Sequence, residues 1–143
     1  MSTKECIFCK IIRGESEGYI VFEDDISLAF LDIRPLNPGH CLLVPKEHYE
    51  TLMDIPEELI GPLFKNAKLI SRAIELGLAV QGIFVGINNR VSQSVPHLHI
   101  HIVPRNKNDG LKGFFWPRYS YKDRETILEI QDKIKKAIER LLV

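Results

Sequence analysis

Three histidines at alternate positions have the clearest capacity for chemistry in this sequence: His97, His99 and His101, within PHLHIHIVPR. Side chains of a β-strand alternate between its two faces. A strand over 96–104 therefore places the three imidazoles on one face and the intervening aliphatic residues on the other. The aliphatic face predicts a core, and the histidine face is predicted to meet a cleft or solvent. Because the imidazole pKa lies near neutrality, three such rings favour metal coordination or nucleophilic chemistry over an ordinary polar face.

The spacing of these histidines argues against a metal site made of the three alone. Successive rings on one face of a flat strand stand about 7 Å apart, whereas zinc ligands lie about 2 Å from a common centre. One or two of the three could bind a metal, which leaves the others free for chemistry. Cys6 and Cys9 form a C-x-x-C pair, which by itself fits a redox motif, half of a metal site or a chance spacing.

The elements that must position these side chains follow from hydrophobic patterning. Helical periodicity predicts a central helix over 54–77, with Asp54 and Glu57 as a capping box, Gly77 as its end and Pro62 as a kink or a shifted start. A second amphipathic helix is predicted over 121–142. Apolar runs bounded by turn residues predict strands at 19–24, 27–33, 41–45, 82–89 and 96–104. The expected fold is α+β: an antiparallel sheet of about five strands with one central and one C-terminal helix.

Composition limits the class of protein. The 143 residues suit a single domain over 1–143. Lys+Arg and Asp+Glu both number 19, which argues against long-range attraction to nucleic acid or to an acidic membrane surface. No apolar run approaches the length of a membrane-spanning helix, and the N-terminal segment lacks the apolar stretch of a secretory signal. We therefore expect a cytoplasmic protein without nucleic-acid or membrane partners, and three cysteines disfavour a disulfide framework.

Several segments in order resemble one family. His97-Leu98-His99-Ile100-His101-Ile102-Val103 resembles the His-φ-His-φ-His-φ-φ signature of the histidine triad (HIT) family, where φ is apolar. The segments CIFCKIIRGE (6–15), LAFLDIRP (28–35), GHCLLVPKEH (39–48) and QSVPHLHIHIVPR (93–105) are similar to its zinc-containing bacterial and archaeal branch of nucleotide hydrolases and transferases. The resemblance implies a HIT-like fold. It also implies an enzyme that acts on the α-phosphate of nucleoside phosphoramidates, adenylates or dinucleoside polyphosphates, with purine bases preferred.

The resemblance also assigns roles to residues. His99 would be the nucleophile that forms a covalent nucleotidyl-histidine intermediate, and His101 would contact the phosphoryl oxygens. Asp32 would accept hydrogen bonds from the ribose hydroxyls, and further nucleotide contacts would come from Asn88, Gln93 and Ser94. From the local sequence alone, Asp32 and Asn88 also fit turns. The phosphate loop departs from the family pattern, because 90–92 is Arg-Val-Ser where a Gly-rich stretch is expected.

The same resemblance implies a structural zinc held by Cys6, Cys9, His48 and His97. Two thiolates and two imidazoles make a closed tetrahedral set, which also removes the spacing problem because His97 then belongs to the metal. His40 is predicted to serve local hydrogen bonding in its turn or, as an alternative, to hold a residue of the site in place.

The resemblance further implies binding of a purine nucleotide such as AMP and a homodimer with 111–120, including Trp116, near the interface. Two other functions stay open on the sequence. One is a nucleotide-binding scaffold or regulatory protein with weak or vestigial catalysis, which the altered phosphate loop allows. The other is a zinc-dependent hydrolase with a catalytic metal.

Overall fold

The computed structural model describes residues 5–112 and 117–143. Contacts divide the chain into two compact units, Met1–Asp109 and Gly110–Val143. The first unit contains the sheet and the histidines, and the described residues of the second contain one helix. The sequence-based prediction of a single domain over 1–143 stays a prediction, and Trp116 lies outside the described residues.

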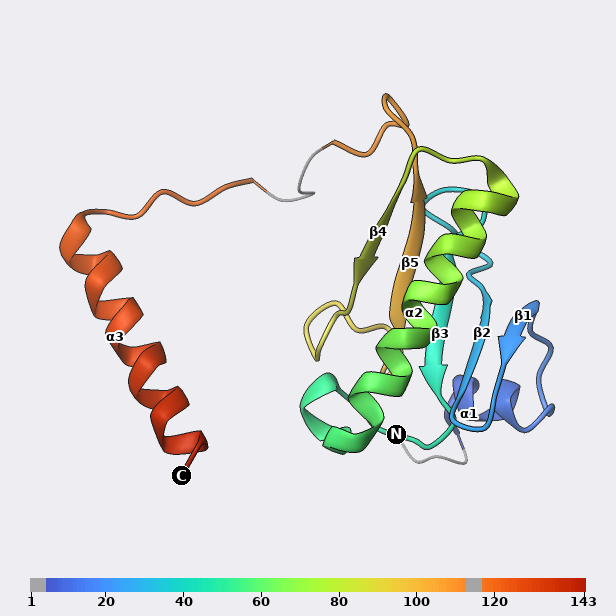
Figure 1. Cartoon of the computed structure of the whole chain (residues 1–143), viewed down its shortest axis with the longest axis horizontal. Helices are drawn as coiled ribbons and strands as arrows, with labels where there is room; N and C mark the ends of the chain where they lie inside the picture. The colour runs from blue at the N-terminus through green and yellow to red at the C-terminus, as the bar shows by residue number, and fades with distance from the viewer. Residues whose placement is uncertain (1–4, 113–116) are drawn as a thin grey trace. The chain divides into compact units, whose positions relative to one another are not determined.

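Five antiparallel strands form one sheet in the order β1-β2-β3-β5-β4 (Figure 1). Strand β3 has the predicted bounds, and β1, β2 and β4 are shorter than predicted. The α+β fold with a five-stranded sheet is confirmed. The strands are β1 (Ile20–Glu23), β2 (Ser27–Leu31), β3 (Cys41–Pro45), β4 (Gly82–Gly86) and β5 (Ile100–Arg105).

The strand that carries the histidines begins later than predicted. Strand β5 starts at Ile100 instead of residue 96, so only His101 of the three lies within it. The backbone N–H of His97 donates to the carbonyl of Val95 at 2.8 Å, and that of Leu98 donates to the carbonyl of Tyr49 at 2.7 Å. The His97 bond closes a turn before β5, and neither N–H bonds to a strand of the sheet.

The central helix differs from its prediction at both ends. Helix α2 spans Glu57–Leu78 and contains Pro62 near its start. The predicted capping box of Asp54 with Glu57 is wrong, because the Asp54 carboxylate accepts from the Thr51 backbone N–H at 3.0 Å and caps the short 3-10 helix η1 (Leu52–Asp54). Gly77 does not end the helix, because the helix continues to Leu78 and the left-handed C-cap residue is Ala79, with φ 53°.

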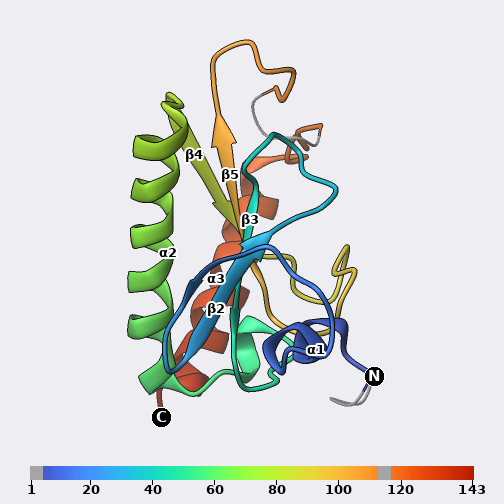
Figure 2. The ribbon, with the colours of Figure 1, turned by 90° about the vertical axis from the view of Figure 1, so that its right-hand side faces the viewer.

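Helix α1 (Ile7–Ile12) was not predicted. It is six residues long, which is too short for helical periodicity to be visible in the sequence. Its N-cap is Cys6, whose Sγ accepts from the Cys9 backbone N–H at 3.4 Å. Figure 2 shows α1 on one side of the sheet and α2 on the other. The position of α1 matters for function because both cysteines of the C-x-x-C pair lie at its start.

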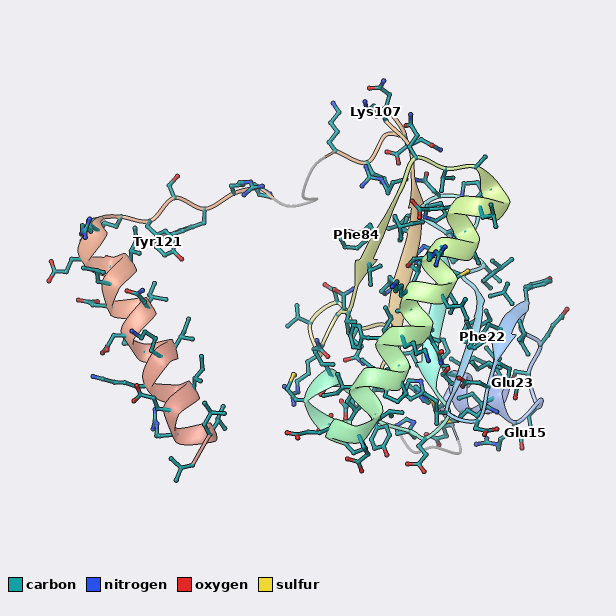
Figure 3. All side chains as sticks on the ribbon, in the orientation of Figure 1. Glu15, Phe22, Glu23, Phe84, Lys107 and Tyr121 are labelled. Atoms are coloured by element: carbon teal, nitrogen blue, oxygen red, sulfur yellow. The ribbon has the colours of Figure 1, made fainter. Side chains whose placement is uncertain are left out.

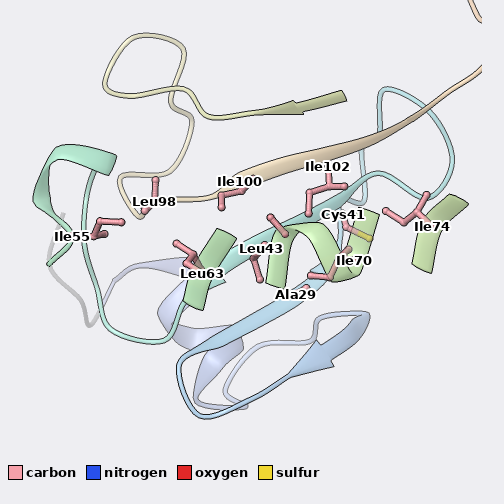
Figure 4. Packing of buried hydrophobic residues seen from close by; sticks show 11 residues of the cluster. Ala29, Cys41, Leu43, Ile55, Leu63, Ile70, Ile74, Leu98, Ile100 and Ile102 are labelled. Carbon is pink, nitrogen blue, oxygen red and sulfur yellow. The ribbon is translucent and has the colours of Figure 1, made fainter. Parts of the chain in front are cut away.

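Alternation of side chains along the strands separates two apolar layers. Phe22 and Glu23 on β1 (Figure 3) show the pattern at the sheet edge: Phe22 packs against the core on the α2 side, while Glu23 pairs with Lys46 at 2.8 Å. Leu98, Ile100 and Ile102 belong to the buried cluster under α2 (Figure 4). A second buried cluster lies on the opposite face: Cys6, Phe8, Cys9, Ile11, Leu28, Phe30, Leu42 and Val44. Each fully buried aliphatic or aromatic side chain contributes roughly 1.5–3 kcal/mol to stability.

The second unit contains helix α3 (Arg124–Leu141), close to the predicted 121–142. Its N-cap is Asp123, whose carboxylate accepts from the Thr126 backbone N–H at 2.7 Å. The predicted apolar stripe is present and exposed, at 38 % for Ile130 and 57 % for Ile134. Among the helices of the described residues, none is long and apolar enough to cross a membrane.

Candidate functional site

The three histidines lie on the α1 side of the sheet, as their alternation predicts. The rings of His97 and His99 lie 6.0 and 5.1 Å from the ring of Phe8 in α1, measured between centroids. His101 follows at 4.9 Å from His99 and pairs across the sheet with Leu42 of β3. The alternation of faces thus continues through the turn that precedes β5.

The expected exposure of the histidine face is wrong for two of the three rings. His97 is 0 % exposed and His99 is 3 % exposed, whereas His101 is half-buried. The unpredicted helix α1 accounts for the difference, because Phe8 packs edge-on against both rings. The accessible side of the histidine row is therefore the side at His101.

The proton position on His99 is set by the backbone. Its Nδ1 lies 2.8 Å from the carbonyl oxygen of His97. Since a carbonyl can only accept, Nδ1 carries the hydrogen and Nε2 of the neutral ring keeps its lone pair. Burial lowers the pKa of His99, a shift opposed by the hydrogen bond to His97 and by the charge of Asp32. The ring is therefore neutral near pH 7, with one unprotonated nitrogen available as a nucleophile.

Cys6, Cys9, His48 and His97 converge as a four-residue cluster, with their ligand atoms all within 4.8 Å of one another. Cys9 Sγ lies 3.3 Å from His48 Nδ1 and 3.5 Å from His97 Nδ1, and the two Nδ1 atoms are 3.2 Å apart. A tetrahedral zinc site has N–N edges of roughly 3.3 Å and N–S edges of roughly 3.6 Å. These three donor–donor distances therefore match the edges of a tetrahedral Cys2His2 site.

The protonation chemistry of this cluster also fits a metal. His97 Nε2 lies 2.9 Å from the carbonyl oxygen of Pro45, so Nε2 carries the hydrogen and Nδ1 faces the cluster as a lone pair. Burial lowers the pKa of His97 to about 4, which keeps the ring neutral. Burial and the neighbouring Cys6 raise the pKa of the Cys9 thiol to about 11. Metal binding near neutral pH would therefore displace thiol protons.

Asp32 lies beside the accessible end of the histidine row. It follows β2, and its carboxylate forms a group with His40 and His101 whose ligand atoms lie within 4.8 Å of one another. One carboxylate oxygen, Oδ1, accepts from the Arg34 backbone N–H at 2.9 Å, so the turn role weighed for Asp32 is real. The other oxygen, Oδ2, points toward His40 at 3.8 Å.

The loop before β5 contains the remaining predicted contacts. Asn88 is half-buried and Ser94 is exposed. The Gln93 side chain is engaged within the fold: its oxygen accepts from the Arg90 N–H at 2.7 Å, and its NH2 donates to the Glu50 carbonyl at 2.5 Å. Gln93 thus fixes the loop against the segment after β3. The predicted nucleotide contacts of Asn88, Gln93 and Ser94 stay predictions.

The loop contains two left-handed residues that are not glycine. Arg90 and Ser92 have φ angles of 71° and 61°, in the left-handed region that glycine enters at no steric cost. For other residues this region costs roughly 1–2 kcal/mol each. Two residues of the Arg-Val-Ser segment therefore adopt a backbone conformation that glycine favours.

His40 has two ring contacts that bear on the site. The predicted local bond exists, since the Leu36 backbone N–H donates to its Nδ1 at 3.1 Å. The same ring also contacts His101, with 5.2 Å between centroids. Alternation along the strand indicates this contact, because residues 40 and 42 share a face and Leu42 pairs with His101.

A cavity of about 940 Å³ lies on the α2 side of the sheet, lined by residues such as Phe22, Ile70 and Ile74. Its lining includes none of the histidines. We therefore assign the chemistry to the histidine face and not to this cavity. Leu31 lines this cavity and packs on the α2 side, whereas Phe8, Ile11 and Phe30 lie on the histidine side.

The chain is similar to known proteins in sequence and in structure over most of its length. The protein hit of Bacillus subtilis is 39% identical over 140 residues, which cover 94% of this chain and 95% of the relative. The crystal structure of a member of the HIT family from Bacillus subtilis has a TM-score of 0.83 and 37% identity, over 92% of this chain and 96% of that one.

Two further relatives carry informative descriptions. Adenosine 5'-monophosphoramidase hnt1 of Schizosaccharomyces pombe is 34% identical over 133 residues, which cover 91% of this chain and 98% of the relative. A Zn-bound histidine triad family protein from Mycobacterium smegmatis has a TM-score of 0.73 and 35% identity, over 87% of this chain and 88% of that one. The family model of the HIT domain matches residues 13–108. The chain therefore belongs to the histidine triad (HIT) family.

Proposed function

We propose that this chain is an enzyme that hydrolyses or transfers the nucleotidyl group of purine nucleoside phosphoramidates, adenylates or dinucleoside polyphosphates. The observation that carries the proposal is the orientation of His99, whose Nδ1–H donates to the His97 carbonyl at 2.8 Å and leaves Nε2 unprotonated. The monophosphoramidase activity named for the fission yeast relative supports the phosphoramidate as the first substrate to test.

In the proposed reaction, His99 Nε2 attacks the α-phosphorus and forms an N–P bond while the bond to the leaving group breaks. A departing amine takes a proton from solvent. Water then attacks the same phosphorus and gives a proton to solvent, the His99–phosphorus bond breaks, and the nucleoside monophosphate leaves. His101 donates a hydrogen bond to a phosphoryl oxygen and stabilises the charge that develops there. Both rings are neutral near pH 7, because burial lowers the pKa of His99 and lowers that of His101 to about 4.

Asp32 is proposed to bind the ribose. A carboxylate accepts two hydrogen bonds, which suits the vicinal hydroxyl pair. The Asp32 carboxylate lies within 4.8 Å of ring nitrogens of His40 and His101. This position supports a binding mode in which the ribose and the α-phosphate both lie on the accessible side of the histidine row. Asn88, Gln93 and Ser94 complete the proposed nucleotide contacts.

Cys6, Cys9, His48 and His97 are proposed to hold a structural zinc. The ion would supply a crosslink between the N-terminal segment and the turn before β5, and a closed set of four protein ligands leaves no position for a reacting water. Three of the four ligands are at most 6 % exposed: Cys6, Cys9 and His97. The zinc-bound relative supports this choice of ion.

The assembly and location of the protein follow from the same proposal. We propose a cytoplasmic homodimer that binds purine nucleotides such as AMP, without nucleic-acid or membrane partners. Strand β4 lies at an edge of the sheet, which supports edge-to-edge pairing of two copies. The region 111–120 is proposed to lie near that interface, although 113–116 falls outside the described residues.

The burial of His99, at 3 % exposed, favours a second candidate. In this alternative the chain is a nucleotide-binding scaffold with weak or vestigial catalysis, because a phosphate does not readily reach a covered ring. Turnover separates the two functions. The scaffold predicts AMP binding without turnover of any of the three substrate classes.

The test compares the wild type with His99→Ala, using adenosine 5'-phosphoramidate as substrate and AMP binding by calorimetry. We expect turnover to fall by about 10³-fold or more, because the nucleophile is lost. AMP affinity should change by less than about fivefold, since the contacts of Asp32 with the ribose remain. Unchanged turnover in His99→Ala would reject the enzyme proposal as stated.

A further inference from the structure

We propose that His40 is a positioning residue that fixes His101 in the tautomer with its hydrogen on Nε2. The inference rests on the proposed function of the same site and adds a residue to which that function assigns no role. His40 is 2 % exposed and stands directly before β3, on the histidine face of the sheet. Two hydrogen bonds of its ring carry the argument.

The first bond determines where His40 holds its own proton. The Leu36 backbone N–H donates to His40 Nδ1 at 3.1 Å. A backbone N–H can only donate, so Nδ1 must be unprotonated, and the hydrogen of the neutral ring lies on Nε2. Burial lowers the pKa of His40 despite the charge of Asp32, which keeps this ring neutral near pH 7.

The second hydrogen bond determines which nitrogen of His101 carries the hydrogen. His40 Nε2 lies 3.0 Å from His101 Nδ1. Since His40 Nε2 is the donor, His101 Nδ1 must accept, and the hydrogen of the neutral His101 ring lies on Nε2. Asp32 Oδ2 does not compete for the His40 proton, because 3.8 Å from His40 Nε2 is beyond hydrogen-bond distance.

The consequence is that His99 and His101 each present Nε2 to the phosphate, in opposite protonation states. His99 has its hydrogen on Nδ1 and offers the Nε2 lone pair, whereas His101 has its hydrogen on Nε2 and offers a donor. Their ring centroids are 4.9 Å apart. One ring suits attack on phosphorus, and the other suits a hydrogen bond to a phosphoryl oxygen. Without His40, the His101 tautomer would be set only by solvent and substrate.

A divalent cation is the competing explanation for the cluster of Asp32, His40 and His101, whose ligand atoms lie within 4.8 Å of one another. A cation would need the lone pair of His40 Nε2. The bond from Leu36 N–H places the His40 hydrogen on that atom, which favours the hydrogen-bonded chain.

Two variants separate the positioning role from a merely structural one. In His40→Asn, the amide oxygen takes the place of Nδ1 and still accepts from Leu36 N–H, but the side chain is too short to reach His101. In His40→Gln, the terminal NH2 takes the place of Nε2 and still donates to His101. If His40 only braced the 36–40 loop, His40→Asn would be the milder change. The positioning role predicts that His40→Gln is the milder change.

The direct readout is the tautomer of His101 in the zinc-loaded full chain, measured from imidazole ¹⁵N shifts in two-dimensional NMR. We expect the Nε2–H form in the wild type and in His40→Gln, and a mixture of both tautomers in His40→Asn. With adenosine 5'-phosphoramidate, kcat should fall about tenfold or more in His40→Asn with KM changed less than threefold, because a donor to the transition state is lost part of the time.

Three results would overturn the inference: an Nδ1–H tautomer in the wild type, an unchanged His101 tautomer in His40→Asn, or a second zinc or manganese ion bound in one-to-one ratio and lost in His40→Asn. The NMR measurement needs no substrate. It therefore succeeds or fails independently of the proposed function, which fails instead if the wild type turns over no nucleotide.

Discussion

The carbonyl oxygen of His97 lies 2.8 Å from Nδ1 of His99, so a residue of the proposed zinc site orients the proposed nucleophile through its main chain. The His97 ring is in turn held by Pro45 at 2.9 Å and lies 3.2 Å from the Nδ1 of His48. The proposed metal ligand His97 and the proposed nucleophile His99 are thus two positions apart in the chain and lie in the same short segment of backbone. Disturbing the metal should therefore affect both stability and chemistry.

Replacing a cysteine of the cluster should remove the metal. We expect the wild type to contain about one zinc per chain and Cys9→Ser to contain far less, because a hydroxyl is a poor zinc ligand. The melting temperature and kcat should both fall in Cys9→Ser. Elemental analysis, calorimetry and turnover of adenosine 5'-phosphoramidate measure these effects. Cys41→Ala is the control, because Cys41 is also buried but lies in the α2-side core. Full zinc content in Cys9→Ser would exclude the proposed ligand set.

Neutralising Asp32 should weaken recognition of the ribose. Asp32→Asn keeps an oxygen that can accept from Arg34 N–H, so the turn after β2 is retained. Loss of the charged acceptor should weaken AMP binding about tenfold, in line with roughly 1.5 kcal/mol for a hydrogen bond to a charged group. Binding of 2',3'-dideoxy-AMP should be the same in both proteins, because that ligand lacks the hydroxyls. Equal losses for both ligands would place Asp32 elsewhere on the nucleotide.

Protonation of His101 should destabilise the fold in acid. Burial, with repulsion from His99 and His40, lowers the pKa of His101 to about 4, and Asp32 opposes the shift. An unfolded histidine has a pKa of about 6.5. Between these values the unfolded chain binds a proton that the native chain does not, so stability present above pH 6.5 is lost as the pH falls toward 4.

Urea unfolding at neutral and mildly acidic pH tests this linkage. Between about pH 7 and about pH 5, the free energy of unfolding should fall by about 1 kcal/mol more in the wild type than in His101→Asn. This figure is reduced from the full linkage, because His101 is half-buried and solvent screens part of the effect. Equal pH dependence of the two proteins would mean that His101 titrates normally in the native state.

Relieving the left-handed backbone at Ser92 should stabilise the phosphate loop. Ser92 has φ 61°, and glycine adopts this region without a steric cost. Ser92→Gly should raise the free energy of unfolding by about 0.5–1 kcal/mol. Ser92→Ala is the matched control, because it removes the hydroxyl but keeps the Cβ that causes the strain. A gain of stability in Ser92→Ala equal to that in Ser92→Gly would show that the hydroxyl and not the backbone is responsible.

The sequence alone predicted what depends on local alternation. The parity of His97, His99 and His101 against Leu98, Ile100 and Ile102 predicted both faces, and the two clusters of the structure confirm it. The bounds of β3 were predicted, because its apolar run is flanked by Gly39–His40 and by Lys46.

Contacts between distant segments were not predicted. The helix that begins after Cys6 is too short to show a period, so the burial of His99 under Phe8 was missed. The bond between His40 and His101 joins residues that are 61 positions apart, and only the pairing of β3 with β5 brings them together. The start of β5 was misplaced for a similar reason, because the Leu98 N–H bonds to Tyr49 on another segment.

Trapping the proposed covalent intermediate tests the central claim most directly. Wild-type protein is mixed with an α-³²P-labelled adenosine phosphoramidate, quenched in alkali within milliseconds, digested and sequenced by mass spectrometry. We predict an adenylyl group on the peptide that contains His99, attached to that imidazole, forming and decaying at rates that account for turnover. Turnover without a labelled histidine, or label on His101 in place of His99, would contradict the proposed role of His99.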